Sequence, residues 1–134
     1  MRLVILLTAF LIAFAPVRAS DDIAAAQTII RSQAEAFERD DAAAAYAYAA
    51  PAIQGMFSQA DIFMSMVRRS YPPVYRHKSF AFGEARIEDG RIAQQVRIVD
   101  ADGLPWDALY ALEWQADGTL KITGCVLKAV GQPA

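Results

Sequence analysis

The sequence has 134 residues, of which 55% are apolar and 21% charged, and its formal net charge is −2 at pH 7. A chain of this length normally forms one domain around one core. The weakly acidic balance argues against a nucleic-acid-binding protein, because phosphate recognition needs a concentrated basic surface and Arg68-Arg69 is a lone pair. The single cysteine, Cys125, leaves no intramolecular disulfide.

Residues 1–19 have the features of a cleavable secretory signal. Arg2 supplies the positive start, and residues 3–15 form an uncharged apolar run too short to span a bilayer. Ala19 is the small residue expected before a cleavage point, and no cysteine lies near it for lipid attachment. We expect an exported protein, periplasmic or secreted, with no stable membrane anchor and a single domain over residues 20–134. An uncleaved N-terminal anchor is the alternative.

The first half of this domain predicts helices. Ser20, Asp21 and Asp22 are N-cap candidates for a first helix that ends near Arg39. Its apolar residues recur at spacings of three and four: Ile23, Ala26, Ile30, Ala34 and Phe37.

Three shorter helical segments follow. Asp40-Asp41 predicts the cap of a second helix over 42–48, and another helical turn is expected at 53–57. A further helix opens at residues 58–61, with Asp61 as a cap candidate. Tyr71-Pro72-Pro73 ends it, and we expect a rigid extended connection there.

The second half of the domain changes to period two and predicts strands. The four expected strands are 77–87, 91–99, 104–115 and 120–128. Asp-Gly dipeptides separate them at 89–90, 102–103 and 117–118, and each predicts a hairpin turn. An antiparallel meander follows from these three turns.

Both faces of this sheet carry apolar residues. Leu109 and Ala111 lie opposite the face that holds most of the apolar side chains of the third strand, which are Trp106, Ala108, Tyr110, Leu112 and Trp114. Short helices can cover only one face, so the other is solvated, folded over a pocket or covered by another subunit. We favour a homodimer through the sheet.

Cys125 lies between apolar neighbours in the last strand, within residues 122–127. No His, Lys or Arg is adjacent in sequence to lower the pKa of its thiol. We therefore expect a small buried apolar residue and not a nucleophile.

Helices followed by a long antiparallel sheet resemble the nuclear-transport-factor-two-like superfamily, which includes ketosteroid-isomerase-like, scytalone dehydratase and SnoaL-like folds. This resemblance implies an α+β fold, with N-terminal helices packed on a curved, cone-shaped sheet of about four strands. A tighter resemblance is to an uncharacterised bacterial family of small exported proteins, a domain of unknown function. It implies no reaction or ligand. The residues that carry it are 33–37 with Asp40, 50–53 with Phe57, 66–67 with 71–75, and 122–127.

In enzymes of the wider superfamily, acids, His and Tyr line the cone-shaped pocket, where burial raises the pKa of a carboxyl group. The resemblance makes Asp40, Tyr75 and His77 the catalytic candidates, and Tyr71, Trp106 and Tyr110 the ligand-binding candidates. The wider set of polar candidates also contains Asp41, Tyr46, Tyr48, Asp61 and Asp107.

These candidates have simpler explanations as well. Asp40, Asp41 and Asp61 fit helix caps, and His77 fits a structural or surface residue. The segment 71–75 can rim a pocket or plug the end of the core. A single His without a nearby Cys builds no zinc site, and no cofactor motif is present, so we expect neither metal nor cofactor.

Three functions remain open at this point. We favour a non-catalytic exported module that binds a small apolar ligand or a partner protein. The alternative is an isomerase-like or dehydratase-like enzyme that uses a buried acid and a tyrosine. A structural component of the cell envelope is the third. The side chains that line the largest cavity distinguish them.

Overall fold

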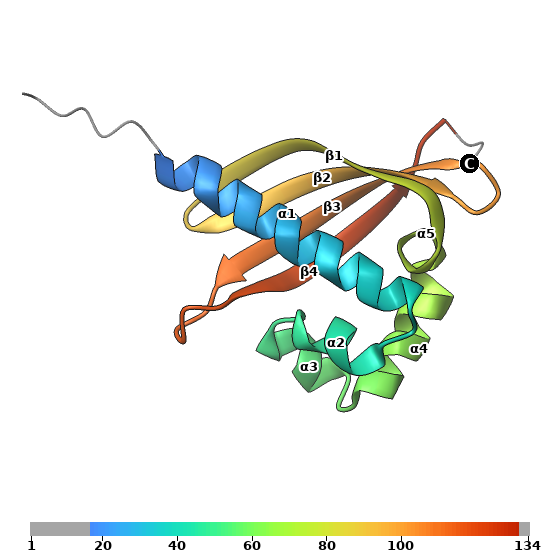
Figure 1. Cartoon of the computed structure of the whole chain (residues 1–134), viewed down its shortest axis with the longest axis horizontal. Helices are drawn as coiled ribbons and strands as arrows, with labels where there is room; N and C mark the ends of the chain where they lie inside the picture. Colours follow the sequence, from blue (N-terminus) through green and yellow to red (C-terminus); the bar gives the residue numbers. More distant parts are fainter. Residues whose placement is uncertain (1–16, 132–134) are drawn as a thin grey trace, which may run out of the picture.

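A computed structural model of the chain describes residues 17–131. Within this range, helices precede a curved, four-stranded antiparallel sheet, which confirms the expected α+β fold (Figure 1). Most of the expected secretory segment, residues 1–16, lies outside the described residues. The helices are α1 (Val17–Glu38), α2 (Ala42–Ala47), α3 (Pro51–Met56), α4 (Ala60–Ser70) and α5 (Pro72–Tyr75). The strands are β1 (His77–Glu88), β2 (Arg91–Asp100), β3 (Pro105–Trp114) and β4 (Leu120–Ala129).

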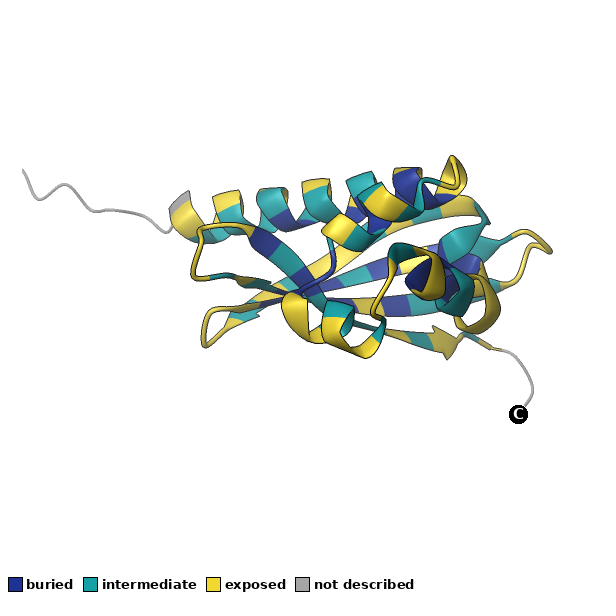
Figure 2. Ribbon diagram, turned by 90° about the horizontal axis from the view of Figure 1, so that it is seen from below, coloured by how far each residue is buried: buried dark blue, intermediate teal, exposed yellow. Residues whose placement is uncertain are grey.

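Helix α1 lies along one face of the sheet and turns its apolar stripe toward it (Figure 2). Ala26, Ile30 and Phe37 are buried, as their spacing predicted. The chain is already helical at Val17, so the expectation that Ser20, Asp21 and Asp22 cap this helix is wrong. Their side chains instead project from within a continuous helix.

The short helices follow the predicted order, with differences at their ends. Asp41 is the N-cap of α2, where its carboxylate accepts a hydrogen bond of 3.0 Å from the Ala44 N–H. Asp61 is not a cap, because α4 begins at Ala60 and its N-cap residue is Gln59. Asp61 lies in the first turn, where its charge still favours the positive end of the helix dipole.

The segment after α4 is helical, where an extended connection was expected. Pro72 and Pro73 occupy the first positions of α5, a single helical turn. Proline fits there because the first N–H groups of a helix have no partner within it and because the fixed φ angle of the ring suits helix initiation. This turn buries Pro73 and Val74 against the core.

The strands form a meander in the order β1-β2-β3-β4. One face is covered by the helices and buries the core side chains Ile92, Val96, Ile98, Ala108, Tyr110 and Leu112. The opposite face mixes the exposed Leu109 and Val126 with an ion pair of 2.7 Å between Arg97 and Asp107. This outer face is apolar only in part, and the homodimer expected through it stays a prediction.

The α2–α3 connection fastens the free edge of β4. The N–H of Ala50 donates to the carbonyl of Ile122 at 2.8 Å, and the Ile122 N–H donates to the carbonyl of Tyr48 at 2.9 Å. Beyond Ile122 the pairing of β4 with β3 shifts register at a bulge. A space is left between the helices α3 and α4 and the strand β4.

Candidate functional site: an apolar pocket beside the edge strand

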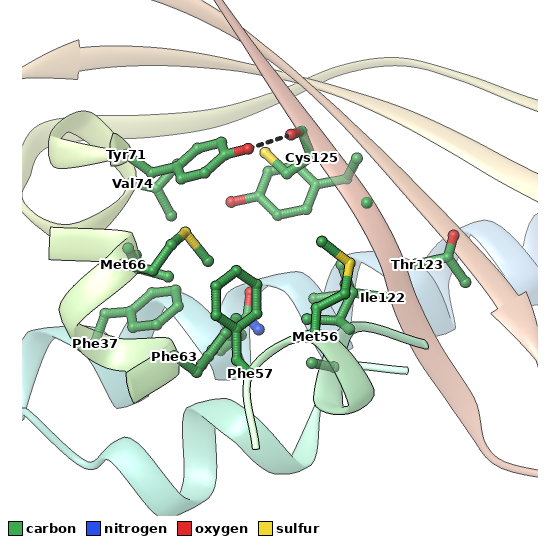
Figure 3. A pocket seen from close by; sticks show the side chains of 16 residues that line it. Phe37, Met56, Phe57, Phe63, Met66, Tyr71, Val74, Ile122, Thr123 and Cys125 are labelled. Atoms are coloured by element: carbon green, nitrogen blue, oxygen red, sulfur yellow. Dashed lines mark hydrogen bonds between the residues drawn. The ribbon is translucent and has the colours of Figure 1, made fainter. Parts of the chain in front are cut away.

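A pocket of about 280 Å³ lies between α1, α3, α4 and β4 (Figure 3). Its walls are mainly apolar side chains from elements far apart in the sequence. Prominent among them are Phe37, Met56, Phe57, Phe63, Met66 and Ile122. Met56 is 74% exposed, so the pocket has an apolar rim on α3.

Phe63 organises the wall formed by the helices. Its ring centroid lies 6.2 Å from that of Phe37, 5.7 Å from that of Tyr46 and 6.2 Å from that of Phe57. The Tyr46 hydroxyl donates to the Phe57 carbonyl at 2.6 Å and thereby holds the end of α3 against α2. These contacts fix the shape of the pocket by packing and not by charge.

A few polar groups interrupt the apolar lining. The residues that contribute them are Gln33, Tyr71, Tyr110, Thr123 and Cys125, and the Tyr71 hydroxyl donates to the Cys125 carbonyl at 3.2 Å (Figure 3). Among the described residues, no Asp, Glu, His, Lys or Arg lines the pocket. The interior is therefore uncharged at neutral pH.

The thiol of Cys125 and the phenol of Tyr110 are neighbours in this lining. Burial raises the pKa of the Cys125 thiol to about 12, with a small opposing effect of the Tyr110 hydrogen bond. Burial also raises the pKa of Tyr110 well above its ordinary value. As a whole residue Cys125 is only intermediate in exposure, where full burial was expected, because β4 is an edge strand.

The catalytic candidates Asp40 and Tyr75 meet each other outside the pocket. Tyr75 donates a hydrogen bond to the Asp40 carboxylate, and Arg76 approaches the other carboxylate oxygen at 3.0 Å. The Tyr75 hydrogen bond, and next the Arg76 charge, lower the pKa of Asp40, which is solvent-exposed. An exposed, ionised carboxylate of this kind has the opposite properties to the buried acid that the enzyme hypothesis requires.

His77 lies close to this pair and is held by structural contacts. Its Nδ1 lies 3.0 Å from the Pro73 carbonyl, and its Nε2 lies 3.5 Å from the Glu38 carboxylate. The imidazole packs on Phe80 with the ring centroids 4.9 Å apart. Asp40, Tyr75 and His77 thus gather at the junction of α1, α5 and β1, and none of them lines the pocket.

The other acidic candidates are also away from the pocket. Asp41 caps α2, Asp61 is exposed on α4, and Asp107 pairs with Arg97 on the outer face.

The ligand-binding candidates divide between two places. Tyr71 and Tyr110 line the pocket. Trp106 does not, and its indole N–H donates to the Asp100 carboxylate at 2.9 Å beside the β2–β3 turn. Asp100 also accepts the N–H groups of Asp102 and Leu104, so Trp106 belongs to a turn network.

Gln33 is the pocket residue that sequence reasoning missed. It follows Ile30 by three positions and precedes Phe37 by four, so it lies within the apolar stripe of α1. A polar side chain inside such a stripe was the available signal. Met56, Phe57 and Met66 were not identifiable, because only the folded chain brings α3 and α4 against β4.

Two classes of site are not found in the described part of the chain. Residues 17–131 contain no group of three or more His, Cys, Asp or Glu side chains placed to hold a metal ion. In the same part of the chain, no helix has the length and apolar character needed to cross a membrane.

Comparison with known proteins gives a family whose description names no activity. A family model described as "Domain of unknown function (DUF4864)" matches residues 19–134. This agrees with the domain of unknown function inferred from the sequence. No curated protein matches the chain, and no solved structure matches it.

Proposed function

Because the chain belongs to the family described as Domain of unknown function (DUF4864), a description that names no activity, we propose a function from the pocket itself: a non-catalytic module that binds a small apolar ligand. The observation that carries this proposal is a pocket of about 280 Å³ with an apolar lining and no charged side chain among the described residues. Apolar pockets with few polar groups are the usual form of small-molecule sites.

The volume indicates the size of the ligand. An engineered apolar cavity of about 150 Å³ in another protein accommodates benzene. The pocket here is close to twice that volume, which fits a bicyclic ring system or a chain of medium length. Such a ligand would also cover part of the exposed Met56 side chain at the rim.

The enzyme alternative receives less support from the site. An isomerase or dehydratase mechanism needs an acid and a second polar group converging on the substrate. The four acidic candidates, Asp40, Asp41, Asp61 and Asp107, all lie outside the pocket lining.

The proposal also includes export of the protein and its membership of a wider superfamily. The signal-like residues 1–19 support an exported, periplasmic or secreted protein. The order of helices before a curved antiparallel sheet supports membership of the nuclear-transport-factor-two-like superfamily. Fractionation of cells that express the full chain, with mass measurement of the processed N-terminus, tests the location.

Titration with naphthalene, followed by amide chemical shifts in NMR, tests the binding function. We expect the shifts to concentrate on α4 and β4, around Met66 and Cys125. Met66→Trp fills the pocket from α4 and should abolish the shifts, whereas Ile62→Trp on the exposed side of the same helix should leave them. Shifts that are absent, or that scatter over the surface and survive Met66→Trp, would refute the binding function.

A further inference from the structure

Among the polar groups of the pocket, the side-chain oxygen of Gln33 is free to accept a hydrogen bond from a ligand. Gln33 is only 5% exposed and lines the pocket. Its Nε2 donates to the Ala45 carbonyl at 3.1 Å. A carbonyl oxygen can only accept, so the amide nitrogen must face Ala45 and Oε1 must face elsewhere. No described residue donates a hydrogen bond to this Oε1.

The two tyrosines add acceptor oxygens to the same pocket. The Tyr71 proton is used in the bond to the Cys125 carbonyl, and the Tyr110 side chain lines the same pocket beside its strand partner Cys125. Each hydroxyl oxygen keeps lone pairs after its proton is committed. Gln33 and Tyr71 therefore offer a ligand acceptor lone pairs, because the donor of each is already bonded to a backbone carbonyl.

An uncharged interior with a free amide oxygen discriminates between head groups. A carboxylate has only acceptor oxygens, so it cannot donate to Gln33 Oε1, and the described lining holds no cation to neutralise its charge. A hydroxyl or amide N–H would satisfy the free Gln33 oxygen. An apolar molecule with no donor would fill the volume but leave that oxygen without a partner.

We propose, on the basis of the proposed binding function, that the ligand is a neutral apolar molecule with one hydrogen-bond donor, a hydroxyl or an amide N–H, which donates to Gln33 Oε1. The pocket selects this class over carboxylates of the same length. Fatty alcohols, phenols and primary or secondary amides of medium size belong to the class.

The test uses three ligands with equal chain length or composition on the unaltered protein. 1-Octanol has a donor, heptyl methyl ether is its isomer without a donor, and octanoate at pH 8 is an anion. We expect 1-octanol to bind about three- to ten-fold more tightly than the ether, the advantage of one satisfied hydrogen bond, and octanoate to bind most weakly.

Paired variants locate the effect at Gln33. Gln33→Met removes the free oxygen, and Gln27→Met is the control because Gln27 on the same helix also donates one bond of 3.1 Å, to Gln94, away from this pocket. We expect Gln33→Met to lose the preference for 1-octanol over the ether, and Gln27→Met to keep it. If Gln33→Met does not fold, the side-chain amide NMR signals of Gln33 in the unaltered protein replace the pair: they should shift with 1-octanol more than with the ether, and equal shifts would overturn the proposal.

The outcomes separate the two proposals. Equal affinity for 1-octanol and the ether, or tightest binding of octanoate, overturns the selectivity and leaves the apolar binding function intact. Failure of naphthalene and of all three ligands to bind overturns the binding function itself.

Discussion

Tyr75 donates a hydrogen bond to the carboxylate of Asp40 and so joins the C-terminal end of α1 to α5. Asp40 adopts a left-handed conformation, with φ of 54°, which Asp tolerates better than most residues. Arg76 reinforces the junction, because its guanidinium lies 4.0 Å from the Tyr75 ring centroid and donates to the Phe37 carbonyl at 2.7 Å. The residues first considered as catalytic thus fix where α1 ends.

This junction predicts a dependence of stability on pH. The folded-state pKa of Asp40 is lowered below its ordinary 3.8, first by the Tyr75 hydrogen bond and then by Arg76. The stabilisation is present above about pH 4 and is lost as the pH falls through the folded-state value. Tyr75→Phe should lower the free energy of unfolding at pH 7 and reduce its loss between pH 5 and pH 2.

Urea unfolding at several pH values measures this effect, with Tyr48→Phe as the control. Asp100 and Asp117 also have lowered pKa values, from their own hydrogen bonds, so part of the acid dependence will remain in the variant. Identical acid dependence in Tyr75→Phe and the unaltered chain would contradict the role given to this hydrogen bond.

Cys125 should be unreactive in the folded protein. Because burial raises its pKa to about 12, the thiolate fraction at pH 8 is far below that of an ordinary thiol. We expect an aromatic disulfide at pH 8 to label the folded protein about a hundred-fold more slowly than the protein unfolded in denaturant. Rapid labelling of the folded chain, under conditions where unfolding is negligible, would show that the thiol is open to water.

The raised pKa of Cys125 also makes the free energy of unfolding depend on pH in the alkaline range, with the opposite sign to the effect of Asp40. The neutral thiol is favoured in the folded state, so its contribution is complete below pH 9 and is lost as the pH rises from 9 toward 12. Cys125→Ala should flatten the fall in the free energy of unfolding over that window. Tyr110, whose pKa is also raised, leaves a residual slope at the upper end.

The regular parts of the fold were predictable because their causes are local. The Asp-Gly turns placed Gly90, Gly103 and Gly118 at positive φ angles of 76°, 85° and 84°, where glycine has no steric cost. Period two and the turn signals located every strand end to within one residue. The helical turn of α5 was missed because Pro72-Pro73 was interpreted as a break, although proline also suits the first turn of a helix.

The pocket was only partly predictable, because it depends on contacts between distant elements. The sequence identified Tyr71 and Tyr110 through a family resemblance, yet no local pattern showed that Met66 and Phe57 line the same pocket. The register shift in β1 between Phe82 and Ala85 is similarly hidden, since its stabilising partner lies on another strand.

Helix capping offers a direct test of the difference between Asp41 and Asp61. Asp41→Ala removes the acceptor of the Ala44 N–H and should destabilise the protein by about 1 kcal/mol. Asp61→Ala loses only a helix-dipole interaction at an exposed site, which contributes about 0.3 to 1 kcal/mol at low ionic strength and less in salt. Denaturant unfolding in high salt should therefore show a loss for Asp41→Ala alone, and equal losses would contradict the assignment.

Gln94 stabilises the bulge of β1, and its replacement should have the largest effect on stability. This side chain is fully buried, its Nε2 donates to the carbonyls of Gly83 at 3.1 Å and Glu84 at 3.3 Å, and its Oε1 accepts from Gln27 at 3.1 Å. Gln94→Leu removes these hydrogen bonds, at about 1 to 3 kcal/mol for each partner that water cannot reach.

Gln95→Leu is the matched control for this prediction, because the neighbouring residue points to the outer face of the same strand and is only half-buried. We expect Gln94→Leu to lower the free energy of unfolding by about 2 to 4 kcal/mol and Gln95→Leu to change it by less than about 0.5 kcal/mol. Hydrogen exchange should show the loss first at the bulge, because the carbonyls of residues 83 and 84 lie outside the regular pairing of β1 with β2. If both leucine variants are equally stable, the bulge is held by its backbone alone and not by the amide of Gln94.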